Sequence, residues 1–208
     1  YMRYDTLNTT DLSEAEEDML LVDFDYFFPK SMVPAIPNQV PNDRWMSKYA
    51  HILQDWLGKP LDVSKCLYKA SKDGFTPKAF HQHCDHKGPT LTVIRSKEGW
   101  ILGGYNPLSW QSKRGYQYTK EAFIFTLKNP NGIPPTRYFC KEDHVHNAVY
   151  NHSYFGPTFS DDLSALHSMG SFIHFPHSYE DTTGFGKVTF TGTKESKLEV
   201  KEVEVYAL

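Results

Sequence analysis

The positions of apolar and polar residues along the chain predict a short helix followed by a run of β-strands. Residues 90–95 and 100–105 are rich in β-branched and aromatic side chains, and the loop between them ends in a glycine that suits a hairpin. Just before them, Thr76 and Pro77 form a helix-start signal, with the threonine as cap and the proline in the first turn. We therefore expect a helix over 77–84 and then an antiparallel hairpin.

Residues 43–57 carry a strong amphipathic helical pattern. Asp43 can cap its start and Gly58 can end it. Its apolar residues recur at i, i+1, i+4, i+7, i+8, i+11 and i+12, which produces one wide apolar face. They are Trp45, Met46, Tyr49, Ile52, Leu53, Trp56 and Leu57. We expect this helix to cover an edge or end of the domain; the alternative is a helix that binds a partner.

Alternation of apolar residues predicts further strands towards the C-terminus. It is clearest over 121–127, where one face would be buried. In the last predicted strand, 198–206, the apolar phase shifts by one residue, which predicts a β-bulge near Lys201. Residues 160–186 show little period and are expected to form irregular loops, where function often resides. The other predicted strands are 138–140, 145–152 and 187–191.

Six sequence blocks, taken in order, resemble the TLDc domain. They spread over about residues 60–208 and read LYKASKDGF, KGPTLTVIRS, GGYNPLSW, EAFIFTLKNP, FGPTF and VKEVEVYAL. With its FHxxCDxKGPTLTVI pattern, the chain is more similar to TLDc proteins of unicellular eukaryotes and invertebrates than to the oxidation-resistance proteins. The resemblance implies an α+β, mostly β fold, a two-sheet antiparallel β-sandwich flanked by helices. It also implies protein binding, notably to the vacuolar proton pump, and oxidative-stress resistance rather than an established reaction.

Charge divides the chain into two parts, although its net charge is only −3. Residues 1–43 contain nine acidic and two basic residues, whereas the remainder contains sixteen acidic and twenty basic ones. We expect an acidic N-terminal extension over 1–42 that packs on the body, and a TLDc-like domain over 43–208 that includes its leading helix. The extension is interpreted either as a simple packed or solvated segment or as one that masks or mimics a partner.

The cysteines and two short sequence patterns bear on the compartment. Cys66, Cys84 and Cys140 cannot all pair within one chain and form no CxxC motif, which favours free thiols in a reducing cytoplasm. Asn8 and Asn151 stand in N-x-Ser/Thr patterns, which keep an extracellular form open. No apolar run is long enough to predict a transmembrane segment. The first residue is tyrosine, which is compatible with a removed leader or a longer parent protein.

Two histidine-rich stretches are candidate metal sites. On a helix, His81 and Cys84 share one face, and His144 and His146 would share one face of a strand. Zinc takes about four ligands from converging elements, and nothing in the sequence fixes the missing ones. We therefore predict no metal and no cofactor, with Cys84 in the core and the histidines on the surface.

The candidate catalytic residues come mainly from the resemblance, since the chain has no Gly-x-Ser-x-Gly elbow and no phosphate-binding glycine pattern. The family has been proposed to carry an acid–histidine–acid set, and its two acids map onto Asp73 and Glu204. The histidine does not map cleanly, so His167, His174 and His177 are only regional candidates. An aspartate before a glycine can hydrogen-bond its own turn. We expect a structural tie between this turn and the last strand.

The sequence leaves several functions open. We favour a non-catalytic protein-interaction or regulatory module, which by resemblance binds the vacuolar proton pump or acts in oxidative-stress resistance. The alternatives are a hydrolase-like or redox-protective enzyme that uses Asp73, Glu204 and a loop histidine, and an extracellular ligand- or glycan-binding module. Lysine and arginine are scattered and the isoelectric point is near 6.4, so we predict no nucleic-acid binding.

Overall fold

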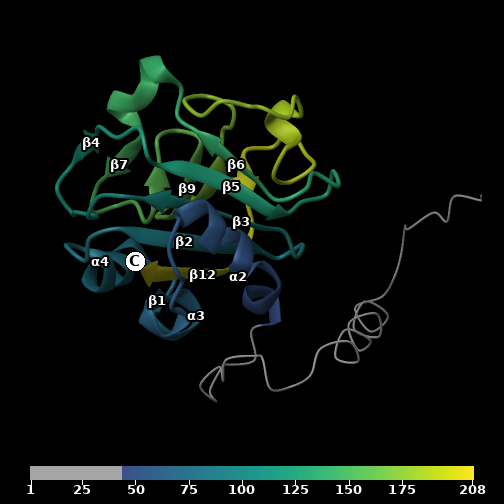
Figure 1. The fold of residues 1–208 in the computed structure, drawn as a ribbon. Helices are drawn as coiled ribbons and strands as arrows, with labels where there is room; N and C mark the ends of the chain where they lie inside the picture. The colour runs from purple at the N-terminus through teal and green to yellow at the C-terminus, as the bar shows by residue number, and fades with distance from the viewer. Residues whose placement is uncertain (1–43) are drawn as a thin grey trace, which may run out of the picture. The chain divides into compact units, whose positions relative to one another are not determined.

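The computed structural model describes residues 44–208. The acidic extension predicted over 1–42, its packing on the body and the cap predicted at Asp43 lie outside the described residues. Two larger β-sheets, a separate two-stranded sheet and several helices make up the described part (Figure 1). The helices are α2 (Arg44–Leu57), η2 (Val63–Lys65), α3 (Ala70–Asp73), α4 (Pro77–Cys84), η3 (Glu142–Asn147) and η4 (Gly186–Val188).

The larger sheet has six antiparallel strands in the order β1-β12-β2-β3-β5-β6, so the last strand of the chain lies inside it. They are β1 (Cys66–Lys69), β12 (Val200–Ala207), β2 (Thr90–Ser96), β3 (Ile101–Asn106), β5 (Phe123–Lys128) and β6 (Thr136–Phe139). The second sheet has the order β11-β10-β9-β8, and β4 pairs separately with β7. Their bounds are β11 (Lys197–Leu198), β10 (Gly170–Ile173), β9 (Leu163–His167), β8 (Thr158–Phe159), β4 (Gly115–Gln117) and β7 (Val149–Asn151).

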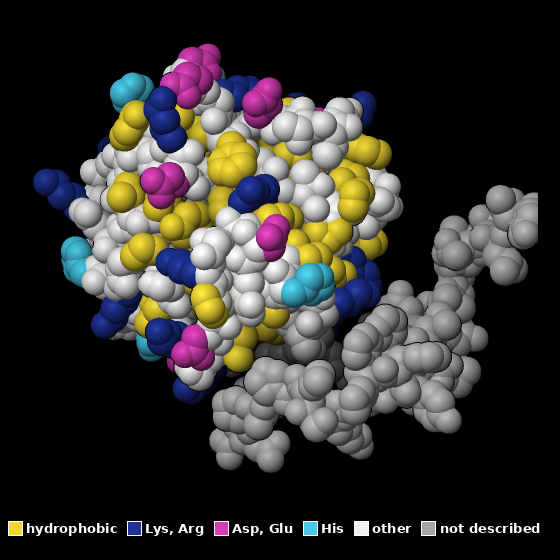
Figure 2. All heavy atoms as spheres, viewed as in Figure 1, with side chains coloured by type: hydrophobic (Ala, Val, Ile, Leu, Met, Phe, Trp, Pro, Cys, Tyr) yellow, Lys and Arg dark blue, Asp and Glu magenta, His cyan; other side chains and the backbone are white. Residues whose placement is uncertain are grey.

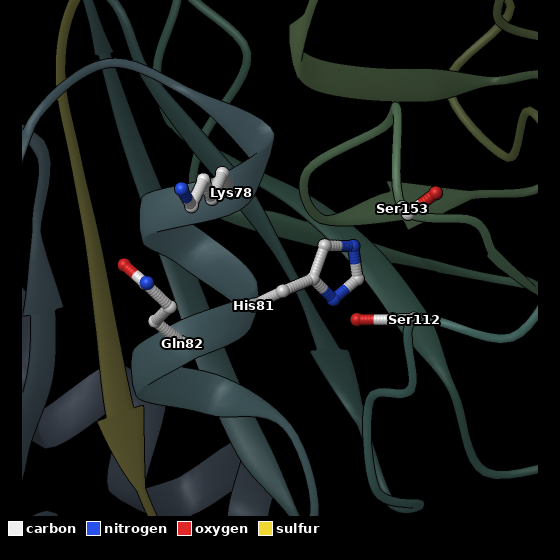
Figure 3. A pocket seen from close by; sticks show the side chains of 5 residues that line it. All are labelled: Lys78, His81, Gln82, Ser112 and Ser153. Carbon is white, nitrogen blue, oxygen red and sulfur yellow. The ribbon is translucent and has the colours of Figure 1, made fainter.

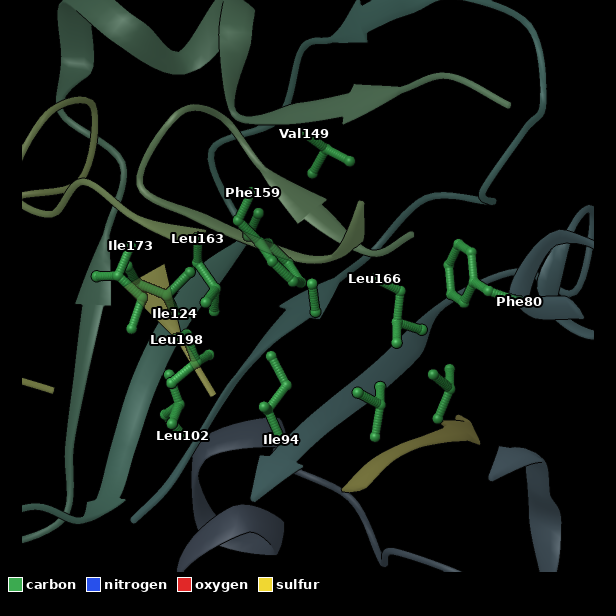
Figure 4. Packing of buried hydrophobic residues seen from close by; sticks show 14 of the residues in the cluster. Phe80, Ile94, Leu102, Ile124, Val149, Phe159, Leu163, Leu166, Ile173 and Leu198 are labelled. Carbon is green, nitrogen blue, oxygen red and sulfur yellow. The ribbon is translucent and has the colours of Figure 1, made fainter. Parts of the chain in front are cut away.

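The main hydrophobic core lies between the six-stranded and four-stranded sheets (Figure 4). The large sheet contributes buried side chains such as Ile94 and Leu102, and the smaller sheet contributes Phe159, Leu163 and Ile173. Because every strand pair in both sheets is antiparallel, the predicted two-sheet antiparallel sandwich is confirmed.

A second core lies on the opposite face of the large sheet, under helix α2. Strand β5 alternates between the two cores, with Phe123 and Phe125 towards α2 and Ile124 towards the second sheet. The Trp56 ring lies 5.8 Å from that of Phe125, and Leu53 is fully buried. The helix therefore covers a face of the sheet rather than an edge or end, because the sheet is apolar on both faces and needs cover on each.

Three local predictions are confirmed. Helix α4 spans Pro77–Cys84, and the Thr76 hydroxyl accepts the Ala79 N–H at 3.1 Å as its cap. The β2–β3 hairpin forms with Gly99 at a φ of 90° in its loop. The register of β12 against β2 shifts between Val200 and Glu202, which places the predicted bulge at Lys201.

Three other expectations for the C-terminal half were wrong. His144 and His146 lie on the 3₁₀ helix η3 instead of a strand, because that segment is polar apart from Val145, and the strand begins only at Val149. The strand expected over 187–191 is the turn of η4 and a loop that buries Phe190. The region expected to be irregular contains β9 and β10.

Candidate functional site

Asp73 closes the single turn of α3 rather than projecting from a free loop. Its carboxylate Oδ2 accepts the backbone N–H of Lys69, the residue before the helix, at 2.9 Å. Gly74 follows with a φ of 104°, a conformation that favours glycine and lets the chain leave the helix. The adjacent Tyr68 hydroxyl donates to the Gly74 carbonyl at 2.6 Å. The Asp73 side chain therefore satisfies a donor at the start of its own helix.

Glu204 lies opposite Lys69 in the antiparallel pair of β1 and β12. It is a buried side chain, and its Oε1 accepts from the Lys69 ammonium at 2.7 Å. Two residues earlier, Glu202 is also buried and accepts the backbone N–H of Ser71, inside α3, at 2.9 Å. Through Lys69, the structure brings Asp73 and Glu204 to one place, with each acid bonded to a different donor of that lysine. This is the tie between first turn and last strand that the sequence led us to expect.

The histidines proposed to complete a catalytic set lie in the second sheet and its loops. The ring of His167 packs 4.2 Å from that of Phe155. The backbone N–H groups of His174 and His177 donate to Asp162, to its carbonyl and its carboxylate respectively. Within residues 44–208, none of these three forms a hydrogen bond or ion pair with Asp73 or Glu204.

A histidine that the sequence did not single out lies near Asp73. The Nε2 atom of His83 is 3.8 Å from Asp73 Oδ1, and its Nδ1 donates to the Ala79 carbonyl at 2.8 Å. His83 comes one helical turn after Ala79, so its position on the face of α4 nearest α3 follows from the spacing of that helix. The bond between Asp73 and the Lys69 N–H also had a signal in the sequence, because Lys69 lies four residues before Asp73.

His81 is a buried junction between α4 and the loop after β7. Its Nδ1 lies 2.6 Å from Asp85 Oδ1, and its Nε2 lies 3.0 Å and 2.9 Å from the carbonyl oxygens of His152 and Phe155. Both ring nitrogens face protein oxygens within hydrogen-bond distance, so neither is open to a metal ion. Burial also raises the pKa of the Cys84 thiol, with Asp85 adding to the effect. Such a thiol is a poor source of the thiolate that binds zinc.

A shallow depression of about 280 Å³ lies beside this junction (Figure 3). In it, His81 points from α4 towards Ser112, while Ser153 lies on the facing loop. The Ser112 hydroxyl donates to Asp85 Oδ2 at 2.7 Å. A serine nucleophile needs a base nitrogen beside its hydroxyl. Because both nitrogens of His81 face other oxygens, Ser112 lacks that partner here. The other residues of the depression are Lys78 and Gln82.

The second candidate metal pair is His144 and His146, and their rings contact different neighbours. His144 Nδ1 contacts Asp143 at 2.8 Å, whereas the His146 ring packs 5.1 Å from that of Tyr118. Across residues 44–208, no group of three or more histidine, cysteine, aspartate or glutamate side chains is placed to hold a metal ion. The same part of the chain contains no helix with the length and apolarity needed to cross a membrane.

Exposed and half-buried aromatic rings contact one another over β4, β7, the loop after β7, and the end of β9. The Tyr116 and Tyr150 rings lie 4.7 Å apart, and Tyr150 contacts Phe155 at 5.5 Å. Tyr154 and Met169 are 68% and 77% exposed, which is unusual for such large apolar groups. We call this surface the aromatic band; it comprises Tyr116, Tyr150, His152, Tyr154, Phe155, His167 and Met169.

A second group of hydrophobic side chains lies on the face that carries α2, interspersed with Lys or Arg side chains (Figure 2). There the Arg137 guanidinium donates to the Trp56 carbonyl at 2.8 Å and lies 5.2 Å from the Phe139 ring. The Arg137 side chain in this group is therefore already engaged with residues of the same face. Within the described residues, the phenolic hydroxyls of Tyr116, Tyr150 and Tyr154 form no hydrogen bond, so they are available to a partner molecule.

Comparison with known proteins decides the family. The model of the TLDc domain matches residues 37–208, which is most of the chain. The chain belongs to the TLDc family. The match includes α2, both sheets and the acids that the resemblance indicated, and it supports a regulatory or interaction module of the TLDc type.

Curated relatives of this TLDc chain include "MTOR-associated protein MEAK7" of three animals. The Danio rerio protein is 24% identical over 136 residues, which cover 58% of this chain and 27% of that protein. The Mus musculus and Xenopus laevis proteins are 32% and 30% identical over 53 residues, covering 24% of this chain and 12% of each relative. The chain thus matches about a quarter or less of the length of these relatives.

The structure shows the state of the three cysteines and the surroundings of Asn151, the N-glycosylation pattern that lies within the TLDc domain. Cys66, Cys84 and Cys140 are free thiols, and burial raises the pKa of Cys140 to about 11. Asn151 is only 3% exposed, and its side-chain oxygen accepts the Gln111 N–H at 3.0 Å. A glycan on Asn151 would require this buried side chain to leave its place.

Proposed function

We propose that this TLDc chain is a non-catalytic protein-interaction module. The observation that carries the proposal is the bonding of Lys69, whose backbone N–H is held by Asp73 and whose ammonium is held by Glu204. Acids that hold a fold together in this way are occupied, whereas catalytic acids must face a substrate. Two surface depressions in residues 44–208, one beside His81 and one beside His174, are lined by neither Asp73 nor Glu204.

The aromatic band is the contact surface in this proposal. Tyrosine presents a broad apolar ring together with a hydroxyl, a combination that is enriched at the centres of protein interfaces. Tyr154 and Met169 lie at its most exposed part and would insert into a partner. His152 would hold the Tyr154 ring in place, since the two rings lie 5.1 Å apart, and Phe155 supports His152 at 5.6 Å.

Two assemblies are the partners that we propose to test. The vacuolar proton pump follows from the TLDc resemblance, which also implies a role in oxidative-stress resistance. The mTOR kinase follows from the printed name of the relatives, which describes MEAK7 as mTOR-associated. Both partners would place the module in the cytoplasm. The free thiols agree with a reducing compartment.

Binding to purified assemblies tests this proposal directly. The tagged chain is immobilised, and vacuolar proton pump or mTOR complex is passed over it while mass accumulation is recorded. We expect the wild-type chain to retain one of the two assemblies, and Tyr154→Ser with Met169→Ser to reduce that affinity by about tenfold or more, as for central interface residues. Phe185→Ser is the matched control because Phe185 is 44% exposed outside the band.

Two results would oppose the proposal. One is a wild-type chain that retains neither assembly, and the other is a doubly substituted band that binds as well as wild type. Circular dichroism of each variant checks that the fold is intact.

The alternative function, an enzyme, is favoured only by the 3.8 Å approach of His83 to Asp73. It predicts that Asp73→Asn keeps the fold and abolishes a hydrolytic or redox-protective activity.

A further inference from the structure

A small depression on the second sheet is lined by basic groups from three separate segments. It measures about 250 Å³, and its sides are formed by His174 at the end of β10, Lys187 on η4, and Lys194 and Ser196 before β11. Ile173 contributes the remaining wall. We call it the basic depression. No acidic side chain lines it in the part of the chain that the structure describes.

The two lysines of the basic depression lack counter-ions, although acidic residues lie nearby in the sequence. Glu199 contacts Lys197 and also pairs with Lys97 at 3.1 Å. Lys187 and Lys194 form no ion pair with any residue of 44–208. Two ammonium groups at one depression repel each other unless an anion lies between them. The positive charges of Lys187 and Lys194 are therefore available to an anionic ligand that is not part of residues 44–208.

The segment that carries Lys187 is held firmly in place. The Asp181 carboxylate accepts the N–H of Thr183 at 2.9 Å, of Gly184 at 3.0 Å and of Gly186 at 2.6 Å. Burial alone would raise the pKa of Asp181, but these hydrogen bonds lower it, so the carboxylate stays charged. On the other side of Lys187, the Val188 carbonyl accepts from Asn131 at 2.6 Å.

The other two sides of the basic depression are also fixed. The Ser196 carbonyl accepts the Ile173 N–H at 2.7 Å, which joins the Lys194 segment to the end of β10. The His174 backbone N–H donates to the Asp162 carbonyl at 2.9 Å, and its ring Nδ1 lies 3.2 Å from the Asp161 carbonyl. With Nδ1 donating in this way, the His174 ring forms a fixed wall of the basic depression. The backbone segments that carry Lys187 and Lys194 are thus fixed before a ligand arrives.

We propose that the basic depression binds a phosphate group carried by a small phosphorylated compound or by a lipid headgroup. A phosphate monoester carries close to two negative charges at neutral pH and accepts several hydrogen bonds. The Lys187 and Lys194 ammonium groups and the Ser196 hydroxyl match that charge and demand for donors. The volume suits one phosphate and its immediate substituent. None of the residues of the aromatic band is used.

Nuclear magnetic resonance of the full chain tests the site. Inorganic phosphate is titrated into ¹⁵N-labelled protein at constant ionic strength, and the amide shifts of Lys187, Lys194 and Ser196 are followed. We expect saturable shifts at these amides and about a tenfold or greater loss of affinity in the Lys187→Gln, Lys194→Gln double variant. The control is Lys113→Gln, an exposed lysine outside the basic depression, which keeps wild-type affinity.

Other arms of the experiment identify the source of the phosphate group. Binding of inorganic phosphate together with sedimentation on phosphatidylcholine vesicles that contain phosphatidylinositol 4-phosphate assigns the site to a lipid headgroup. Phosphate binding without such sedimentation assigns it to a free compound. The site is overturned if the shifts fail to saturate, if acetate produces equal shifts, or if the Lys113 variant loses as much affinity as the double variant.

Discussion

Lys69 and Glu204 face each other across the pair of β1 and β12, with the lysine Nζ 2.7 Å from the glutamate Oε1. They are 135 residues apart in the sequence. The carboxylate is buried and the ammonium is partly exposed. The pair therefore fixes the edge strand to the last strand of the chain, and its loss would leave a buried carboxylate without this partner.

Removing the lysine should weaken the fold more than neutralising the acid. We expect Lys69→Met to lower the free energy of unfolding by about 1–3 kcal/mol, since a buried acceptor loses a charged donor that is itself partly screened by solvent. Glu204→Gln should cost on the order of 1 kcal/mol because its amide oxygen still accepts. Urea denaturation measures both. Lys97→Met, at an exposed pair with Glu199, should change nothing measurable; equal losses in all three variants would contradict this account.

On helix α2, Leu53 should contribute more to the free energy of unfolding than Trp56. A fully buried leucine replaced by alanine costs about 2–5 kcal/mol. A fully buried tryptophan would cost about 3–5 kcal/mol, but Trp56 is only partly buried, so we expect a loss of about 2 kcal/mol. Unfolding by urea with tryptophan-independent detection, such as far-ultraviolet circular dichroism, checks both. A change of less than about 0.5 kcal/mol in Leu53→Ala would show that the helix does not cover the sheet.

Gly104 allows the Phe159 ring to approach the middle of β3. A Cβ at this position would lie 2.5 Å from the ring Cζ. We expect Gly104→Ala to lower the free energy of unfolding by about 1–3 kcal/mol, because the added methyl group overpacks the core. Gly115→Ala is the matched control in β4, since an added Cβ there meets nothing within 4 Å. Differential scanning calorimetry of the two variants would reject this packing if they melted at the same temperature.

The stability of the domain should depend on the protonation of His167. Partial burial lowers the pKa of His167, and the nearby His152 adds to the effect. The unfolded chain binds this proton near pH 6.5, whereas the folded chain binds it only at lower pH. The contribution of His167 is thus present above about pH 6.5 and is lost as the pH falls through the folded-state pKa.

His167→Phe should reduce this acid sensitivity while keeping a ring against Phe155. We expect the melting temperature of the variant to fall less than that of wild type between about pH 7.5 and pH 5, the range that spans the unfolded-state pKa. Melting curves at several pH values provide the measurement. His51→Phe, at an exposed histidine on α2, serves as control and should follow the wild-type curve. Identical curves for wild type and the His167 variant would argue against the role of His167.

The sequence predicted those features whose cause is local. The phase slip around Lys201 is visible in the apolar pattern, and the bulge lies there. Thr76 and Pro77 predicted the start of α4 because a cap and a first-turn proline act within one turn of the helix.

Features that depend on distant partners could not be predicted. Strands β9 and β10 were missed because almost all residues of β9 are buried and Leu166 adopts a φ of 59°, so no two-residue alternation appears. The candidate acids were named through a family resemblance, but their common donor, Lys69, depends on the register between the two strands. Glu202 had a visible signal, since two glutamates alternate with valines in the last strand.

The central claim is that Asp73 and Glu204 hold the fold while the aromatic band meets the partner. The most direct test measures melting temperature and proton-pump or mTOR-complex binding together in three variants. We expect Asp73→Ala to lose about 1–3 kcal/mol of stability, Asp73→Asn to lose less and to keep partner affinity, and Tyr154→Ser with Met169→Ser to keep stability and lose affinity. An Asp73→Asn chain with wild-type stability that no longer binds or functions would contradict the account.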